Sequence, residues 1–281
     1  MKNLGYYNGK IDLIENMTIP MNDRACYFGD GIYEVTYARN YKLYCLDEHL
    51  DRLYRSAAKL NIKVPLTKEE FTDLLYDLVK RVDSHEQIIY WQISRGTAFR
   101  IHAPKEELTA NVFINIRPMS IKDTYQPMKL ITMEDTRFLH CDIKTINLIP
   151  AVMASIKAQE MGVDETVFHR GEFVTECAHS NVSIIRADGA LQTAPADNKI
   201  LEGIARGNLI KFCKKFGVPV IEEAFTLDEM MNASEIIVTA SGTLCAPASE
   251  VDGIKVGGKA PELLKQLQDA LVGDFIEKTT V

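Results

Sequence analysis

The stretch FLHCDIKTINL, residues 138–148, contains a single lysine, Lys144, among apolar and small polar residues. Burial disfavours the charged form of a lysine, and a neutral amine can attack a carbonyl carbon and form a Schiff base. Lys144 is therefore a candidate covalent catalyst. The competing interpretation places it at the end of a strand with its amine in water, because most lysines are exposed. The stretch alone leaves both interpretations open.

The composition bounds the class of protein. The 281 residues suffice for one large or two medium domains, and the net charge is −7. Nucleic acid is an unfavourable partner for such a chain, because phosphate binding requires a basic surface. No apolar run approaches the ~20 residues that cross a bilayer, and the first residues lack the apolar core of a signal peptide. The six cysteines form no C-x-x-C pair and the six histidines show no metal-ligand spacing. We therefore expect a cytoplasmic protein with reduced thiols and no metal site.

The first half of the chain reads as an α+β unit with an antiparallel sheet. Asn8-Gly9 is typical of a type I′ hairpin, since both positions need positive φ. Strands are expected at 32–39, 42–46, 88–94 and 110–116, one helix begins at Asp47, and Thr67 to Glu70 form a capping box for a second.

Two cationic features of this half can be read in two ways. The helix that begins at Asp47 carries its apolar stripe on other positions than Arg52, so periodicity predicts a solvated Arg52. Arg100 and His102 would share one side of an extended segment and could together hold a carboxylate. A charged loop tip is the alternative for Arg100 and His102.

The polar, proline-containing stretch from Arg117 to Pro127 predicts a domain boundary. We expect an N-terminal domain at 1–118, a linker at 119–127 and a C-terminal domain at 128–281. The latter should contain strands at 128–133 and 234–239 and helices at 151–161, 201–216 and 261–277. Gly203 at a helix start, and the loop around Ser241, could each receive a phosphate through backbone N–H groups, although most such glycines are simply caps.

Four stretches together resemble one known family. They are FGDGIYE at 28–34, EHLDRL at 48–53, DIK at 142–144 with Asn147, and TE at 175–176 with SNV at 180–182. The chain resembles the fold-type IV pyridoxal-phosphate enzymes nearly end to end, and most of all the D-amino acid (D-alanine) aminotransferases. The resemblance implies a two-domain α+β fold with a small N-terminal α+β domain and a larger C-terminal mixed α/β domain that binds pyridoxal 5′-phosphate.

The resemblance also implies roles for individual residues. Lys144 would hold pyridoxal phosphate as a Schiff base and move a proton, and Glu176 would pair with the pyridine nitrogen. Arg52, which periodicity assigns to the surface, would bind the cofactor phosphate. The backbone N–H groups of Ile204 and Ala205, with Ser241 nearby, would complete the phosphate site.

The substrate class follows from a further resemblance. Arg100 and His102 resemble the element by which D-amino acid aminotransferases hold the substrate carboxylate together with Tyr33. This implies transfer of an amino group from a D-amino acid, of the D-alanine or D-glutamate type, to a 2-oxo acid, in a homodimer. The alternatives are a branched-chain L-amino acid aminotransferase, an aminodeoxychorismate lyase, and a binding protein without catalysis. Ala205 and His179 depart from the usual Thr and Ser, and the sequence at Ser241 resembles the branched-chain group.

Overall fold

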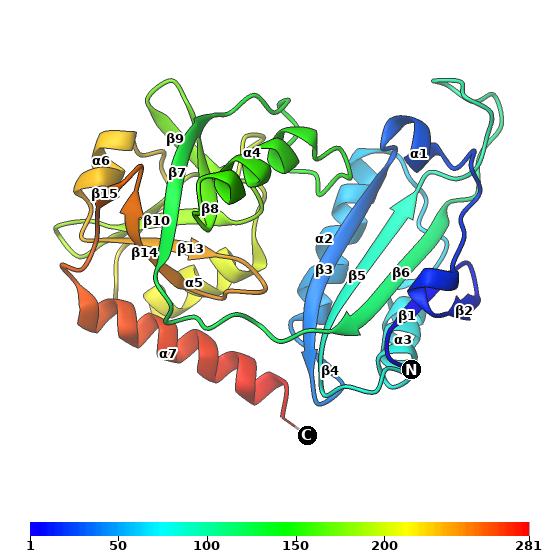
Figure 1. Cartoon of the computed structure of the whole chain (residues 1–281), viewed down its shortest axis with the longest axis horizontal. Helices are drawn as coiled ribbons and strands as arrows, with labels where there is room; N and C mark the ends of the chain where they lie inside the picture. The colour runs from blue at the N-terminus through cyan, green and yellow to red at the C-terminus, as the bar shows by residue number, and fades with distance from the viewer. Residues whose placement is uncertain (281) are drawn as a thin grey trace. The chain divides into compact units, whose positions relative to one another are not determined.

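The computed structural model of the chain describes residues 1–280 and divides the protein into two compact units (Figure 1). Unit 1 consists of Met1–Ile121, Ile143–Asn147 and the end of the chain from Ile276. Unit 2 consists of Lys122–Asp142 and Leu148–Phe275. The short segment that contains Lys144 therefore groups with unit 1, although the chain on both sides of it belongs to unit 2. The domain boundaries expected at 118 and 128 stay a prediction.

Unit 1 is built on an antiparallel six-stranded sheet, ordered β2-β1-β6-β5-β3-β4. Its strands are β1 (Leu4–Tyr7), β2 (Lys10–Asp12), β3 (Gly31–Arg39), β4 (Lys42–Leu43), β5 (Glu86–Ser94) and β6 (Asn111–Pro118). Asn8 and Gly9 have φ values of 46° and 94°, so the predicted hairpin turn is confirmed. The predicted antiparallel sheet is confirmed as well.

The helices of unit 1 are α1 (Arg24–Phe28), α2 (Leu46–Lys59) and α3 (Lys68–Val79), with a 3-10 turn, η1, at Ile14–Asn16. The capping box is present: the Thr67 hydroxyl accepts from the Glu70 N–H, and the Glu70 carboxylate accepts from the Thr67 N–H. The apolar faces of α2 and α3 join the sheet in one core, which includes Leu50, Leu53, Phe71 and Trp91. Packing in this core determines which faces of α2 and β3 are left for the polar side chains of the candidate site.

Unit 2 contains a mixed nine-stranded sheet. Its main path runs β12-β11-β10-β13-β14-β7-β8-β9, and β15 pairs with β14. The strands are β7 (Met128–Glu134), β8 (Glu165–Arg170), β9 (Phe173–Cys177), β10 (Asn181–Ile185), β11 (Leu191–Thr193), β12 (Val220–Ile221), β13 (Glu235–Thr239), β14 (Ala246–Val251) and β15 (Ile254–Lys255). The β7–β8 and β14–β7 pairs are parallel, whereas β8 pairs with β9 and β10 with β13 in antiparallel fashion.

The helices after β7 are α4 (Ile149–Glu160), α5 (Ile204–Lys215), α6 (Leu227–Asn232) and α7 (Pro261–Lys278). Gly162 and Gly217 follow α4 and α5 with φ values of 68° and 74°, in the left-handed conformation that commonly ends a helix. Both helices therefore end within one residue of the predicted positions, 161 and 216. None of the helices in the described part of the chain is long and apolar enough to span a membrane.

Candidate functional site

The segment that contains Lys144 is attached to the start of β3. The Tyr33 N–H donates to the Lys144 carbonyl at 2.9 Å, and the Ile146 N–H donates to the Gly31 carbonyl at 3.2 Å. The Lys144 N–H lies 3.3 Å from the Ser56 hydroxyl of α2. The half-buried Lys144 places its Nζ 4.3 Å from the centre of the Tyr33 ring. Two of the predicted site residues, Lys144 and Tyr33, are thus neighbours within unit 1.

Arg52 is buried, and the surface position that helix periodicity predicted for it is wrong. Its side chain is paired with Glu34 of β3: Nε donates to Oε1 at 2.6 Å and Nη2 donates to Oε2 at 2.8 Å. His49, one turn earlier on α2, places Nδ1 2.7 Å from the same carboxylate. A buried guanidinium is tolerated because an ionised partner with matching geometry compensates its desolvation.

The charge state of this trio follows from its surroundings. Burial raises the pKa of Glu34, but Arg52 and His49 lower it more, so that it falls to about 2. Burial lowers the pKa of His49 despite the neighbouring carboxylate. Glu34 therefore remains an anion, and α2 presents Arg52 as a fixed cation. Sequence reasoning missed His49, although it lies within the quoted stretch at 48–53.

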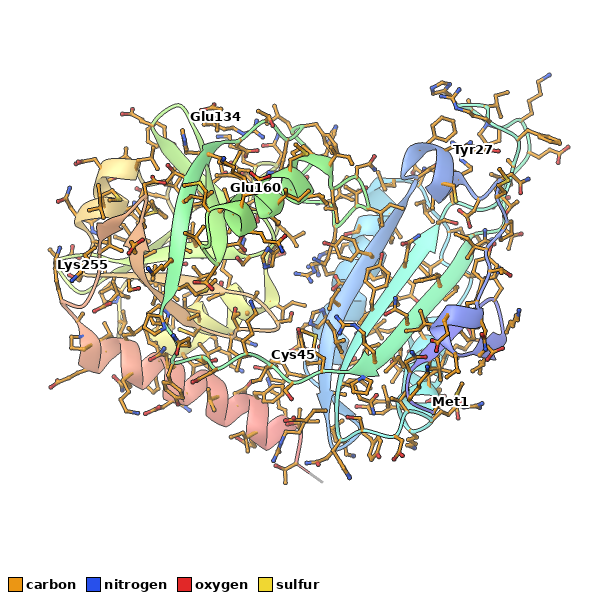
Figure 2. The ribbon with its side chains drawn as sticks, viewed as in Figure 1. Met1, Tyr27, Cys45, Glu134, Glu160 and Lys255 are labelled. Carbon is orange, nitrogen blue, oxygen red and sulfur yellow. The ribbon has the colours of Figure 1, made fainter. Side chains whose placement is uncertain are left out.

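Arg100 and His102 lie close together, but not in the extended segment that the sequence predicted. The segment between β5 and β6 bends and is not a strand, so the extended geometry expected for it is wrong. Both side chains nevertheless lie against Phe28 of α1, the short helix on which Figure 2 labels Tyr27. The Arg100 Cζ lies 5.2 Å and the His102 ring centre 5.1 Å from the centre of the Phe28 ring. Two exposed nitrogen-bearing groups thus gather at one spot.

Glu176 lies in unit 2, near the end of β9, within a network of donors. One oxygen pairs with Arg137, and the other accepts from the Asn181 amide at 2.9 Å and from the Leu201 N–H at 3.0 Å. Arg137 is in turn held by Asp135, with its Nε and Nη2 each 2.9 Å from a carboxylate oxygen. Burial lowers the pKa of Arg137, but Asp135 and Glu176 raise it well above its usual value. Arg137 is therefore a permanent cation beside Glu176.

This network suits a protonated ring nitrogen. Arg137, Asn181 and Leu201 orient the Glu176 carboxylate and stabilise its negative charge, and a carboxylate there can keep a pyridine nitrogen protonated. Sequence reasoning missed Arg137. The acidic and basic cluster at 134–137, directly before the quoted lysine stretch, was the available signal.

The start of α5 suits an anion. Gly203 is its N-cap, and no side chain caps the helix there. A Cβ on Gly203 would lie 1.9 Å from the Asn181 side-chain oxygen, so the helix start packs tightly beside Asn181, the residue that also binds Glu176. The N–H groups of Ile204 and Ala205 belong to this first turn, where helices favour phosphate.

The loop after β13 carries a second feature that fits a polar ligand. Thr239 pairs with Asn181 across the sheet, which places the end of β13 at the same residue as the start of α5. The hydroxyls of Thr239 and Thr243 are buried, and neither has a hydrogen-bond partner among residues 1–280. The half-buried Ser241 lies between them in sequence. Unpartnered buried hydroxyls of this kind are rare, and they suit phosphate oxygens.

Each unit by itself contains groups that suit pyridoxal phosphate. Unit 1 contains an amine, Lys144, and a fixed cation, Arg52. Unit 2 contains an oriented carboxylate, Glu176, an uncapped helix start and two buried hydroxyls, those of Thr239 and Thr243. The predicted role of each residue stays a prediction.

Comparison with known proteins gives the family. A family model described as amino-transferase class IV matches residues 31–251. The chain is 38% identical over 269 residues to a D-alanine aminotransferase of Listeria monocytogenes, which covers 94% of this chain and 93% of that protein. It is 34% identical over 276 residues to a D-alanine aminotransferase of Bacillus licheniformis, with 97% of each chain covered.

Solved structures agree on the fold. A branched-chain aminotransferase from Thermoproteus uzoniensis superposes with a TM-score of 0.88 at 22% identity, over 98% of this chain and 95% of that one. A putative 4-amino-4-deoxychorismate lyase from Legionella pneumophila gives 0.85 at 23% identity, over 93% and 97%. These similarities confirm the expected fold-type IV architecture. The chain belongs to the class IV aminotransferases, pyridoxal-phosphate enzymes that act on amino acids and 2-oxo acids.

Proposed function

We propose that this enzyme transfers the amino group of a D-amino acid, of the D-alanine or D-glutamate type, to a 2-oxo acid. The observation that carries the proposal is the gathering of Arg100 and His102 on Phe28, in a chain 38% identical to a D-alanine aminotransferase. A guanidinium beside an imidazole can grip an α-carboxylate and orient the amino acid. Tyr33, next to Lys144, is the third group that we assign to carboxylate binding.

The remaining site residues take the following roles in the proposal. Bound pyridoxal phosphate supplies an electron sink for charge that develops at the substrate Cα. The Lys144 amine anchors the cofactor covalently and then carries the proton that leaves Cα. Glu176 keeps the ring nitrogen protonated. Arg52, the N–H groups of Ile204 and Ala205, and Ser241 hold the phosphate.

A steady-state assay separates this proposal from its rivals. Purified holoenzyme should form pyruvate and glutamate from D-alanine and 2-oxoglutarate faster than it forms glutamate from L-leucine and 2-oxoglutarate. The reverse preference would establish the branched-chain alternative. Release of pyruvate from aminodeoxychorismate with no oxo acid present would establish the lyase alternative. Inactivity in all three assays would favour the binding protein without catalysis.

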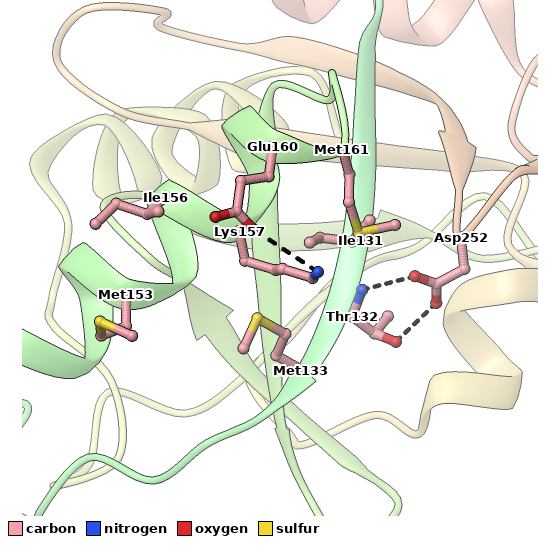
Figure 3. A pocket seen from close by; sticks show the side chains of 9 residues that line it. All are labelled: Ile131, Thr132, Met133, Met153, Ile156, Lys157, Glu160, Met161 and Asp252. Carbon is pink, nitrogen blue, oxygen red and sulfur yellow. Dashed lines mark hydrogen bonds and ion pairs between the residues drawn. The ribbon is translucent and has the colours of Figure 1, made fainter.

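A homodimer is the second part of the proposal, and the outer face of α4 supports it. Ile149, Met153 and Ile156 of α4 are 73%, 60% and 44% exposed. Beside them, a cavity of about 350 Å³ is lined by α4 and β7 side chains, including Met133 and Met153 (Figure 3). Exposed apolar surface of this extent, with Lys157 and Glu160 paired at its edge, is typical of a protein interface.

Sedimentation analysis tests this part of the proposal. The wild type should sediment as a species twice its 31.6 kDa chain mass, and Met153→Glu should shift it towards the monomer. Lys255→Glu, on the exposed β15, is the matched control and should remain dimeric. A wild-type monomer at micromolar concentration would contradict the proposal.

The domain boundaries at 118 and 128 and a cytoplasmic location are further parts of the proposal.

A further inference from the structure

The loop that carries Arg100 and His102 has little structure of its own. Between β5 and β6 it forms neither helix nor strand, apart from one bridge between Thr97 and Asp23. Its apolar side chains Phe99 and Ile101 are 87% and 47% exposed. Burial of its own side chains therefore does not hold the loop, and other contacts must fix the position of the carboxylate-binding pair.

Arg24, the first residue of α1, supplies such contacts. Its Nη1 donates to the Ile101 carbonyl at 2.6 Å and its Nη2 donates to the His102 carbonyl at 3.1 Å. Its backbone N–H donates to the Gly96 carbonyl at 3.0 Å. The residue is only 4% exposed. The planar guanidinium can donate hydrogen bonds to two consecutive carbonyls at once. The single ammonium of a lysine cannot do this with the same geometry.

Arg24 is itself held in place by an ion cluster. Its Nε donates to Asp30 at 2.7 Å, and Arg95 donates to the same carboxylate at 2.9 Å. Arg95 also donates to the Leu60 carbonyl at the end of α2, at 2.9 Å. Burial raises the pKa of Asp30, but Arg95 and Arg24 lower it more, so the carboxylate stays charged. The loop is thereby connected through Arg24 and Asp30 to a packed helix.

The same short helix connects to the lysine segment. The Phe28 ring that supports Arg100 also lies 4.8 Å from the Arg24 Cζ. The Asn147 amide donates to the Gly29 carbonyl at 2.7 Å, directly after α1. α1 therefore contacts both the segment of Lys144 and the loop of Arg100.

We propose that Arg24 is a positioning residue for substrate recognition: it fixes the loop of Arg100 and His102 by binding two of its carbonyls while Asp30 holds it from the other side. The inference rests on the proposed function, because it assigns that loop to the substrate carboxylate. Arg24 touches no substrate in this account.

The test compares two amines that differ only in the carboxylate. D-alanine and ethylamine are reacted separately with Arg24→Met and wild-type holoenzyme. Loss of the charge-assisted contacts should lower kcat/KM for D-alanine about 10- to 100-fold, mainly through KM. The rate with ethylamine, which has no carboxylate, should change less than about threefold. Equal losses for both amines would mean a merely structural role and would overturn the inference.

Control variants make the result specific. Arg117→Met removes an exposed arginine of β6 and should leave both amines unaffected. Arg24→Lys keeps the positive charge but cannot donate to two carbonyls with the same geometry. It should give an intermediate loss of kcat/KM for D-alanine even if Arg24→Met folds poorly. Arg24→Met combined with Arg100→Met should lose less than the sum of the two single losses, because Arg24 acts partly through Arg100, whereas fully additive losses would refute action through the loop. If Arg100→Met itself leaves the preference for D-alanine unchanged, the proposed carboxylate site fails. If Arg100→Met lowers the preference for D-alanine but Arg24→Met leaves it unchanged, the inference about Arg24 fails and the proposed carboxylate site stands.

Discussion

At the scale of single residues, the site depends on charges that are buried in pairs. Glu34 is fully buried and binds both Arg52 and His49. An ion pair in such a place adds little net stability, but removing one partner leaves the other without compensation. The pair is better understood as a way to keep Arg52 fixed and charged at the place where a phosphate is proposed to bind.

Replacing Glu34 should therefore be costly. Glu34→Gln keeps the size of the side chain but leaves the Arg52 guanidinium without its counter-ion, and we expect the free energy of unfolding to fall by about 3–5 kcal/mol. Urea unfolding, followed by fluorescence of the single tryptophan, Trp91, measures the change. Glu69→Gln, at an exposed position of α3, should cost under about 0.5 kcal/mol. A similar small cost for Glu34→Gln would contradict the buried ion pair.

The same residue should make stability depend on acid pH. The pKa of Glu34 is about 2 in the folded chain against an ordinary 4.5. The unfolded chain therefore binds a proton more readily than the folded chain. The contribution of the ionised Glu34 to the free energy of unfolding is fully present above about pH 4.5 and is lost as the pH falls towards 2. Urea unfolding between pH 5 and 2.5 should show a steeper decline for the wild type than for Glu34→Gln, by up to about 3 kcal/mol. Parallel declines would show that Glu34 does not titrate with this shift.

Arg52 also shows what the sequence could not give. Its position off the apolar stripe of α2 predicted exposure, yet Glu34 on a distant strand makes burial possible. Helix periodicity contains no information about partners on other elements, so only the resemblance to a family assigned Arg52 to a site. Arg137 was missed for the same reason, because its partner Glu176 is 39 positions away in the chain.

At the scale of elements, the sequence predicted most helices and strands because their local signals are strong. The Asn8-Gly9 turn, the capping box at Thr67 and the glycines after α4 and α5 each mark a real boundary. The loop before β6 is different. Its residues carry no periodicity, and its shape depends on contacts with Arg24 and Phe28 that lie more than 70 positions away.

The start of α5 offers a test with an internal control. Gly203→Ala would place a Cβ 1.9 Å from the Asn181 oxygen, so it should displace Asn181 from Glu176 and widen the helix start. We expect weaker binding of pyridoxal phosphate, by about tenfold or more, and a lower melting temperature. Gly207→Ala, in the same helix, adds a carbon that meets no atom of residues 1–280 within 4 Å beyond its chain neighbours and the helix's own backbone, and it should raise the free energy of unfolding by about 0.5–1 kcal/mol.

Cofactor titration and thermal unfolding of both variants measure these effects. Unchanged cofactor affinity in Gly203→Ala would count against a phosphate site at this helix start. A loss of affinity in Gly207→Ala as well would point to a general effect on α5 instead.

At the scale of the whole molecule, chain order and spatial grouping differ. Residues 143–147 lie after the predicted linker, but they pair with the start of β3 and belong to unit 1. A boundary read from prolines and polar composition cannot detect such a return of the chain, because the pairing of distant strands depends on the register of both partners. The family resemblance pointed to Lys144 as a site residue, whereas its attachment to β3 became visible only in the structure.

The most direct test of the central claim is a half-reaction of the purified holoenzyme. D-alanine and L-leucine are added separately, without any 2-oxo acid, and the absorbance of the bound cofactor is followed with time. We expect D-alanine to bleach the absorbance and L-leucine to leave it unchanged, and neither amino acid should bleach Lys144→Ala. Bleaching by L-leucine alone would contradict the D-amino acid assignment, and a wild-type protein that binds no pyridoxal phosphate would contradict the account of Lys144 itself.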